Sequence, residues 1–311
     1  MRPARWRRHG LVWGPDGTQA WARSHASTPT PVRLADGRLR VFVQCRDAQQ
    51  VGRIGWVDLD GEDPRRVLGT AGQPALDIGA PGHFDDNGVM ATSVLVLPDG
   101  SLRLYYVGFE LCHRIRYRLL TGVAHSDDGG TSFRRWRTTP VLERTPAEPH
   151  IRGGAWVLRE GDGFRMWYAA GGSWEPIDGK AMPVYDLRHL RSVDGLHWGD
   201  EGQVVLAIVP AHEHGFGRPV VQRFGTGWQM HYSIRRRRPA RYRLGLASSG
   251  DGLLWQREDD MLGLDVQPGS WDSHSIEYGV EITAGGRRWL LYNGDDFGAA
   301  GFGIAERLAD D

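Results

Sequence analysis

The sequence predicts an all-β fold, a five-bladed β-propeller with four antiparallel strands in each blade. Three observations support this prediction. A strand-like segment recurs five times along the 311 residues. Turn-forming residues flank the copies, and no stretch shows the sustained period of about 3.6 residues that marks an amphipathic helix. A fixed long period indicates a repeat architecture.

The repeated segment is rich in aromatic and β-branched residues, which is the composition of a buried strand. Successive copies begin 60 to 64 residues apart. They cover residues 39–45, 102–108, 164–170, 228–234 and 288–294.

Turn signals divide each repeat into two hairpins. Asp-Gly pairs at Asp36-Gly37 and Asp99-Gly100 separate apolar runs, and glycine accepts the positive φ that a tight hairpin needs. A second signature, Ser-x-Asp-Gly, follows the second, third and fourth copies at residues 126–129, 192–195 and 249–252. Two hairpins supply the four strands of one blade.

The fifth repeat lacks one strand, because only residues 301–306 can form another strand after the repeated segment 288–294. Residues 6–12 resemble the fourth-strand segment 136–142. We therefore expect the N-terminal strand to join the last blade and close the ring, which hides the sheet edges. Residues 1–311 are expected to form this single propeller domain.

Composition and charge exclude several classes of protein. The 38 basic and 38 acidic residues cancel, so no long-range field recruits nucleic acid or a membrane. Cys45 and Cys112 are too few for a disulfide framework. Residues 1–8 lack the apolar core of a secretory signal, and no apolar run approaches the ~20 residues needed to span a bilayer. We expect a cytoplasmic protein with a small-molecule partner.

Two compositional features have both a structural and a functional interpretation. The thirteen tryptophans can pack between blades or form an aromatic wall against a sugar ring. The basic run 235–238, with Arg241 and Arg243 after it, can be a solvated loop or a clamp on an anionic substrate.

The segments that lead into the innermost strands of a propeller converge on one mouth, so they are the place to seek a site. Histidines recur there at His25, His150, His214 and His274, while the second blade has Asp85 and Asp86 instead. Converging imidazoles and a carboxylate could hold one divalent ion, Zn, Fe, Mn or Ni. The alternative is that the histidines hydrogen-bond substrate hydroxyls or neighbouring loops.

Carboxylates in the same segments suggest acid–base chemistry. Asp85 or Asp86, with Glu277 and the displaced candidate Glu148, could form the pair of carboxyl groups that glycoside cleavage uses. Arg152 and Arg218 lie near the strand starts, where a guanidinium can bind a carboxylate, phosphate or diol. The alternative for each residue is a loop cap or an ion pair.

The repeats, the Asp-Gly hairpins and the Ser-x-Asp-Gly turns resemble the five-bladed propellers of glycoside hydrolase families 43 and 32. The chain is more closely similar to an uncharacterised glycosidase-like propeller group of polysaccharide and natural-product gene clusters. The matching segments are 25–31, 46–47, 88–94, 218–220, 242–247, 271–272, 292–294 and 301–303. The resemblance implies a carbohydrate-like substrate and adds Arg46, Asp47, Trp271 and Asp272 to the expected substrate-binding residues, beside His25, Arg152 and Arg218.

The chain departs from those hydrolases at the positions of their catalytic carboxylates. They have an aspartate leading into each of the first two blades and an acid glutamate leading into the third. Here the first blade has Ser24-His25, the second keeps Asp85 and Asp86, and the third has Arg152-Gly-Gly.

The leading hypothesis is an enzyme that acts on a carbohydrate or sugar-derived molecule at the channel mouth, with Asp85, Asp86, Glu277 and His150 as catalytic groups. One alternative is a metal-dependent lyase, isomerase, cyclase or oxygenase that uses the four histidines as ligands. The other is a carbohydrate-binding propeller without catalytic activity.

Overall fold

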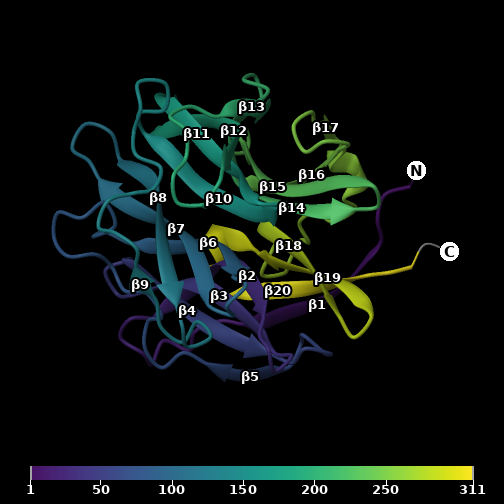
Figure 1. Ribbon diagram of the computed structural model, residues 1–311. Coiled ribbons are helices and arrows are strands. Elements are labelled where there is room, and N and C mark those ends of the chain that lie inside the picture. Colours follow the sequence, from purple (N-terminus) through teal and green to yellow (C-terminus); the bar gives the residue numbers. More distant parts are fainter. Residues whose placement is uncertain (1, 310–311) are drawn as a thin grey trace.

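Five sheets surround a common axis in the computed structural model, which describes residues 2–309 (Figure 1). Met1, Asp310 and Asp311 of the expected 1–311 domain lie outside the described residues. The strands β2, β6, β10, β14 and β18 gather at the centre of the ring, and neighbouring members of this set contact one another. The fold is the five-bladed β-propeller that the repeats predicted.

The first three blades follow one another along the chain. Blade I consists of β2 (Ser24–Arg33), β3 (Leu39–Arg46), β4 (Gly52–Leu59) and β5 (Val67–Thr70). Blade II consists of β6 (Val89–Val96), β7 (Leu102–Leu111), β8 (Tyr117–Ser126) and β9 (Arg134–Arg135). Blade III consists of β10 (Ile151–Glu160), β11 (Gly163–Ile177), β12 (Lys180–Ser192) and β13 (Gln203–Leu206).

The last two blades contain the two short helical turns. Blade IV consists of β14 (Glu213–Phe224), β15 (Gly227–Arg236), β16 (Tyr242–Ser249) and β17 (Gln256–Arg257), followed by the 3-10 turn η1 (Asp259–Met261). Blade V consists of β18 (Glu277–Ala284), β19 (Arg287–Asn293), β20 (Phe302–Arg307) and β1 (Trp6–Trp13). The single turn α1 (Asp295–Gly298) connects β19 to β20.

Each predicted copy of the repeat forms the second strand of its blade, namely β3, β7, β11, β15 and β19. The closure of the ring is also confirmed. Strand β1 pairs antiparallel with β20, from Trp6 opposite Arg307 to Trp13 opposite Phe302. One detail differs, because the fourth strand of blade II is the two-residue β9, which ends just before the expected segment 136–142.

The Ser-x-Asp-Gly turns lock neighbouring blades together. In the turn of blade IV, the Gly252 amide donates to Ser249 Oγ at 2.8 Å, and its carbonyl accepts from Trp167 Nε1 of blade III at 2.8 Å. Gly252 has φ +75°, and a Cβ there would meet the Arg165 guanidinium at 2.8 Å. The turn of blade III repeats this contact, since Gly195 O accepts from Tyr105 OH at 2.7 Å.

The tryptophans observed in the core pack between blades. Trp167 of blade III and Trp289 of blade V are fully buried, and the Trp167 ring lies 5.8 Å from the Trp228 ring of blade IV. Burying an aromatic side chain of this size is among the largest single contributions to a core. These rings therefore fit the structural interpretation of the tryptophan content.

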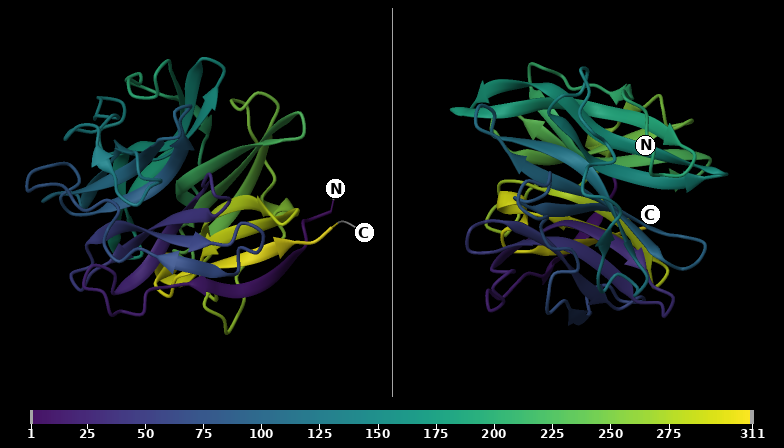
Figure 2. Two further views of the ribbon diagram at one scale, coloured as in Figure 1. Left: turned by 60° about the horizontal axis from the view of Figure 1, so that its bottom comes forward. Right: turned by 60° about the vertical axis from the view of Figure 1, so that its left-hand side comes forward.

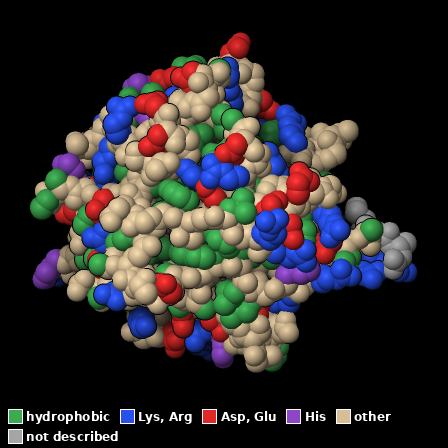
Figure 3. All heavy atoms as spheres, turned by 90° about the horizontal axis from the view of Figure 1, so that it is seen from below, with side chains coloured by type: hydrophobic (Ala, Val, Ile, Leu, Met, Phe, Trp, Pro, Cys, Tyr) green, Lys and Arg blue, Asp and Glu red, His purple; other side chains and the backbone are tan. Residues whose placement is uncertain are grey.

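The outer surface carries charges of both signs. Acidic and basic side chains are interspersed over the face seen from below (Figure 3), in keeping with 38 basic and 38 acidic residues. Among the described residues, the helical turns are too short and too polar for any of them to traverse a lipid bilayer. Residues 2–5 and 308–309 lie close together beside blade V (Figure 2), where the Leu308 amide donates to Arg5 O at 2.9 Å.

Candidate functional site

Four blades contain the same arrangement of a buried tyrosine, a carboxylate and an arginine. The tyrosine occupies the fifth position of the repeated segment and donates its hydroxyl proton to the carboxylate. The tyrosine–carboxylate pairs are Tyr106–Asp85 (2.9 Å), Tyr168–Glu148 (2.8 Å), Tyr232–Asp259 (2.6 Å) and Tyr292–Asp272 (3.0 Å). The arginines that contact these carboxylates are Arg135, Arg188, Arg257 and Arg8, respectively.

This recurrence accounts for three of the residues that the sequence placed at the site. Asp85, Glu148 and Asp272 are fully buried, and each is held by both a tyrosine and an arginine. Buried carboxylates with such partners stabilise a fold only as long as both partners are present. The geometry therefore favours a structural role for Asp85, which was expected to be catalytic, and for Asp272, which was expected to bind substrate.

Arg152 belongs to the same framework in blade III. Its Nε contacts Glu148 Oε2. Its two Nη atoms donate to the carbonyls of Glu143 at 2.6 Å and Gly199 at 3.0 Å. The guanidinium is thus occupied by protein acceptors rather than presented to a ligand.

Three other predicted residues hold loops or pack in blade V. Asp86 accepts from the Gly82 amide at 2.8 Å. Asp47 pairs with Arg53 at 2.7 Å and accepts from two amides of its own hairpin. The Trp271 ring lies 5.0 Å from the Tyr292 ring, at an angle of 34°.

Glu277 differs from all of these carboxylates. It is the first residue of β18 and is 1% exposed, yet among the described residues neither of its carboxyl oxygens forms an ion pair or a hydrogen bond of good geometry. Burial raises the pKa of Glu277 to about 8, although hydrogen bonding by the Ser275 side chain and the Phe297 backbone, together with the charge of Arg235, opposes the shift. Glu277 is therefore a protonated acid at neutral pH, which is the state that a general acid needs.

A cluster of three tyrosines and one arginine surrounds Glu277. Arg235 Nη1 donates to Tyr185 OH at 3.0 Å, and the guanidinium lies 5.3 Å from the centre of the Tyr242 ring. The Tyr242 and Tyr278 rings are 5.8 Å apart. Tyr278 directly follows Glu277, and burial, followed by the charge of Glu277, raises the pKa of Tyr278. The Tyr278 hydroxyl is therefore a neutral donor at neutral pH.

The first blade contributes a second cation and an imidazole to the cluster around Glu277. The Arg46 guanidinium lies 5.9 Å from the Phe297 ring, which is 5.8 Å from the Tyr242 ring. His25 Nδ1 is 2.8 Å from Ser24 Oγ. Burial, together with the charge of Arg46, lowers the pKa of His25 to about 4. His25 is therefore a neutral imidazole beside a cation.

Backbone strain marks the same place. His25 and Tyr278 have φ of +66° and +55°, and the consecutive residues Asp296 and Phe297 of α1 have φ of +54° and +62°. A left-handed conformation costs a residue with a side chain roughly 1–2 kcal/mol. Such strain tends to cluster at functional sites.

The residues around Glu277 that these contacts bring together are named the mouth cluster. They are Glu277, Arg235, Tyr185, Tyr242, Tyr278, His25, Arg46 and Phe297.

Arg218 lies beneath the mouth cluster and ties three blades together. It is 2% exposed. From blade IV it donates to Pro29 O at 3.0 Å and Thr30 Oγ1 at 2.9 Å in blade I, and to Tyr278 O at 2.8 Å in blade V. Burial lowers the pKa of Arg218 to about 9. The Arg218 guanidinium therefore connects blades I, IV and V through hydrogen bonds, which favours a structural role over the predicted role in substrate binding.

The four recurring histidines do not assemble into a ligand set. His214 Nδ1 is 3.1 Å from Pro183 O, and burial with the charge of Arg235 lowers its pKa to about 4. The His274 side chain is 71% exposed and pairs with Asp295 at 3.0 Å. His150 is partly buried, and its Nδ1 has no partner. Within residues 2–309, no group of three or more His, Cys, Asp or Glu side chains is arranged to hold a metal ion.

A hollow of about 560 Å³ lies next to the mouth cluster. Its lining includes Arg237, Arg238, Arg241, Arg243 and His274. One hydrogen bond joins the hollow to the cluster, since Arg243 Nη1 donates to Tyr242 O at 2.8 Å. A second, indirect link is electrostatic: the His274 amide donates to Asp295, and the charge of Asp295 acts on Glu277. We name this hollow the arginine groove.

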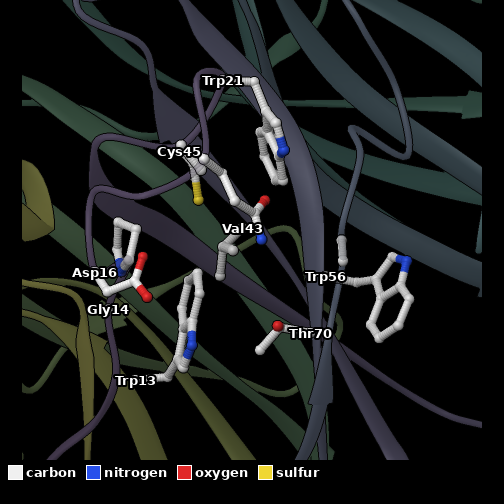
Figure 4. A pocket seen from close by; sticks show the side chains of 12 residues that line it. Trp13, Gly14, Asp16, Trp21, Val43, Cys45, Trp56 and Thr70 are labelled. Carbon is white, nitrogen blue, oxygen red and sulfur yellow. The ribbon is translucent and has the colours of Figure 1, made fainter.

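A smaller cavity, of about 110 Å³, lies elsewhere, in the seam between blades V and I (Figure 4). Trp13, Trp21 and Trp56 line it together with Cys45. Burial raises the pKa of the Cys45 thiol to about 12, so the thiol is unreactive at neutral pH. None of the mouth-cluster residues lines this cavity.

Comparison with known proteins identifies relatives over nearly the whole chain. No protein-family profile matches the sequence. Over 300 residues the chain is 35% identical to "Uncharacterized protein Rv1502" of Mycobacterium tuberculosis, with 96% of this chain and 98% of the relative covered. "Uncharacterized protein MT1551", from another strain of that species, matches equally well. The chain belongs to the Rv1502 family.

Solved structures show the fold of this Rv1502-family protein in other proteins. A protein described as "Glycoside hydrolase" has a TM-score of 0.72 at 18% identity, covering 98% of this chain and 92% of the other. A thermostable family-43 glycoside hydrolase has a TM-score of 0.66 at 15% identity, covering 94% and 93%. An α-L-arabinofuranosidase from Lactobacillus brevis has a TM-score of 0.69 at 10% identity, covering 94% and 95%. At these identities the likeness concerns the fold alone.

Sequence reasoning missed most of the mouth cluster. Tyr185, Tyr242, Tyr278 and Phe297 look like ordinary core aromatics in the sequence. Arg235 begins the basic run 235–238, which the sequence offered as a clamp on an anionic substrate, but nothing in the sequence set it apart from the other arginines of that run. A signal did exist for the structural carboxylates. Asp85, Glu148 and Asp272 precede their tyrosines by 21, 20 and 20 residues. This shared spacing marks them as equivalent positions of the repeat, and Glu277 does not have it.

Proposed function

We propose that this Rv1502-family protein is an enzyme that acts on a carbohydrate or sugar-derived molecule at the mouth cluster, with Glu277 as the proton donor. The observation that carries the proposal is a buried carboxyl group that forms no ion pair among the described residues and has a pKa raised to about 8. Strongly perturbed groups of this kind concentrate at functional sites. The glycoside hydrolases among its structural neighbours support the substrate class.

The proposed chemistry begins with transfer of the Glu277 proton to the oxygen that leaves the sugar. A water molecule forms the new bond to the anomeric carbon, and the neutral imidazole of His25 accepts the proton that this water loses. The rings of Tyr242 and Phe297 offer faces on which a sugar can pack. Tyr185, which already accepts from Arg235, can donate its own hydroxyl proton to a substrate oxygen. The Arg235 guanidinium then stabilises negative charge on or near that oxygen.

Under this proposal residues 1–311 work as one domain, since the site draws on blades I, III, IV and V. A role in polysaccharide or natural-product biosynthesis belongs to the same proposal. The substrate is a small molecule, and neither nucleic acid nor a membrane takes part.

A second function, carbohydrate binding without turnover, is favoured by one specific observation. Asp85 and Glu148, the carboxylates nearest in sequence to the hydrolase positions, are held by Tyr106 and Tyr168. Hydrolysis by paired carboxyl groups needs both groups beside the scissile bond. A mouth with Glu277 as its single protonated acid could therefore bind sugar without cleaving it.

The test is turnover of a panel of aryl glycosides and oligosaccharides by wild type and Glu277→Gln. We expect loss of turnover by about 10²-fold or more, the usual contribution of a general acid, with sugar binding retained. Glu281→Gln is the matched control, because Glu281 lies on the same strand, is also buried and lines the hollow at the other end of the axis. Equal turnover by Glu277→Gln and wild type would reject the role of Glu277. Binding without turnover of any substrate would favour the second function.

A further inference from the structure

The mouth cluster carries positive charge that no protein carboxylate neutralises. No ion pair within 4.0 Å forms for Arg46 or Arg235 among the described residues, whereas most buried carboxylates elsewhere in the ring have an arginine partner. Within residues 2–309, the Arg235 guanidinium donates to the Tyr185 hydroxyl and to no carboxylate. The side chain of Arg46 makes no hydrogen bond within residues 2–309 and contacts the Phe297 ring instead.

Glu277 does not supply the missing negative charge. It lies more than 4.0 Å from the Arg235 guanidinium, since no ion pair joins them within residues 2–309. Burial keeps it protonated at neutral pH. The neighbouring imidazoles, His25 and His214, are neutral as well. Two cations therefore face a cluster whose other members are uncharged, and an unpaired buried charge is costly.

The two arginines act on the same part of the cluster. The electrostatic influence of both falls on Tyr278, and both lie near rings that contact Tyr242, Arg235 directly and Arg46 through Phe297. Guanidinium groups that lack protein acceptors are suited to paired hydrogen bonds with a carboxylate or phosphate. A planar or tetrahedral anion bound here would lie beside Glu277.

The arginine groove extends this positive charge to the surface. Arg237 and Arg243 are neutralised by Glu175 at 2.7 Å and Asp265 at 2.9 Å. Arg238 and Arg241 have no acidic partner among the described residues. Asp178 is the acidic residue in the lining. The lining of the arginine groove therefore carries a net positive charge that favours the approach of a negatively charged molecule.

We propose that the ligand of the mouth cluster is an acidic sugar, whose carboxylate or phosphate group binds between Arg46 and Arg235. This inference rests on the proposed site and narrows its substrate class. Arg218 is not part of it, because its guanidinium is occupied by acceptors of blades I and V.

The test is calorimetric titration of the full chain with four probes at millimolar concentration. D-glucuronate carries a carboxylate, glucose 1-phosphate carries a phosphate, glucose is neutral, and inorganic phosphate is the anion without a sugar. We expect one of the two acidic sugars to bind at least about tenfold more tightly than glucose, the effect of one charge-assisted hydrogen bond or more. Which of the two binds distinguishes a carboxylate from a phosphate ligand.

Variants locate the binding. Arg46→Gln and Arg235→Gln should each weaken binding of the acidic sugar by about tenfold or more, with little effect on glucose. Arg159→Gln is the matched control, because Arg159 is exposed and lies at the other end of the axis. A thermal melt of each variant verifies that it is folded. If Arg235→Gln unfolds, Arg235→Lys keeps the charge without the paired donors and should still weaken binding.

Three outcomes would overturn the proposal. They are binding of neither acidic sugar, equal binding of glucose and the acidic sugars, or equal binding of inorganic phosphate, which would indicate an adventitious ion only. Failure of the proposed function looks different. In that case the acidic sugar would bind through Arg46 and Arg235, but turnover would be absent or independent of Glu277.

Discussion

Tyr106 donates its hydroxyl proton to Asp85 Oδ2 at 2.9 Å, and the same oxygen accepts from Arg135 Nε at 2.7 Å. Tyr168 and Tyr292 stand in the same relationship to Glu148 and Asp272. The relationship recurs because each tyrosine occupies the same position of the repeat. It joins the second strand of a blade to the loop that leads into its innermost strand, so it fixes the loop on which the mouth is built.

We predict that Asp85→Asn destabilises the fold, because it leaves the Arg135 charge without its carboxylate. Breaking a buried pair on one side costs about 3–5 kcal/mol. Tyr106→Phe should cost less, about 1–3 kcal/mol, since the Asp85–Arg135 pair survives. Urea unfolding at neutral pH measures both. Unchanged stability of Asp85→Asn with lost turnover would instead make Asp85 catalytic, as the sequence first suggested.

We predict that the stability of the wild type decreases with pH through Glu277. Its pKa is raised from 4.5 to about 8 in the folded protein, so between these values the folded state binds one more proton than the unfolded state. The free energy of unfolding then falls by about 1.4 kcal/mol per pH unit in this window from this group alone.

Glu277→Gln removes that dependence, because glutamine does not titrate. The difference in melting temperature between Glu277→Gln and wild type should therefore grow in favour of the variant as the pH rises from 4.5 to about 8. A constant difference across the window would mean that Glu277 is ionised in the folded state.

We predict that Arg218→Met lowers stability by about 2–4 kcal/mol, because acceptors in blades I and V lose their charged donor. Part of this loss is offset, because methionine does not carry the cost of burying a cation that has no carboxylate partner. Urea unfolding gives the magnitude, and titration with the acidic sugar gives the function. Normal stability combined with lost sugar binding would restore Arg218 to the role of a substrate clamp.

We predict that purified protein contains well under one Zn, Fe, Mn or Ni ion per chain, because the recurring histidines do not converge. Elemental analysis of untagged protein, prepared without chelators, measures this. If one ion per chain were present and were lost in His25→Ala and His214→Ala, the metal-dependent hypothesis would regain its basis. Turnover after chelator treatment should match that of untreated protein.

The fold could be predicted because its signals are local and periodic. Aromatic residues recur every 60 to 64 residues, and the closure was visible as a missing strand at one end matched by a spare strand at the other. The histidine pattern was equally regular, yet regular spacing does not set side-chain direction. His25 adopts a positive φ, and His274 points to solvent.

The mouth cluster could not be predicted because its contacts are not periodic. Tyr185 and Arg235 are 50 residues apart. They meet because the β11–β12 hairpin is longer than its counterparts and carries Tyr185 against blade IV, where it packs over Gly215. No other repeat has an equivalent of this extension. Glu277 was predicted as a catalytic group, but the sequence could not show that it is buried without an ion-pair partner among residues 2–309.

The pairing of β1 with β20 also sets the order in which the chain can be completed. Blade V combines residues 6–13 with residues 277–307, so β1 can pair with β20 only after the other four blades have been synthesised. Until the two strands pair, the edge of β20 and the core-packing residues Trp6, Val12 and Trp13 of β1 are available to other chains. Aggregation during synthesis is therefore expected to begin at this seam, and a circularly permuted chain in which β1 directly follows β20 should suppress it.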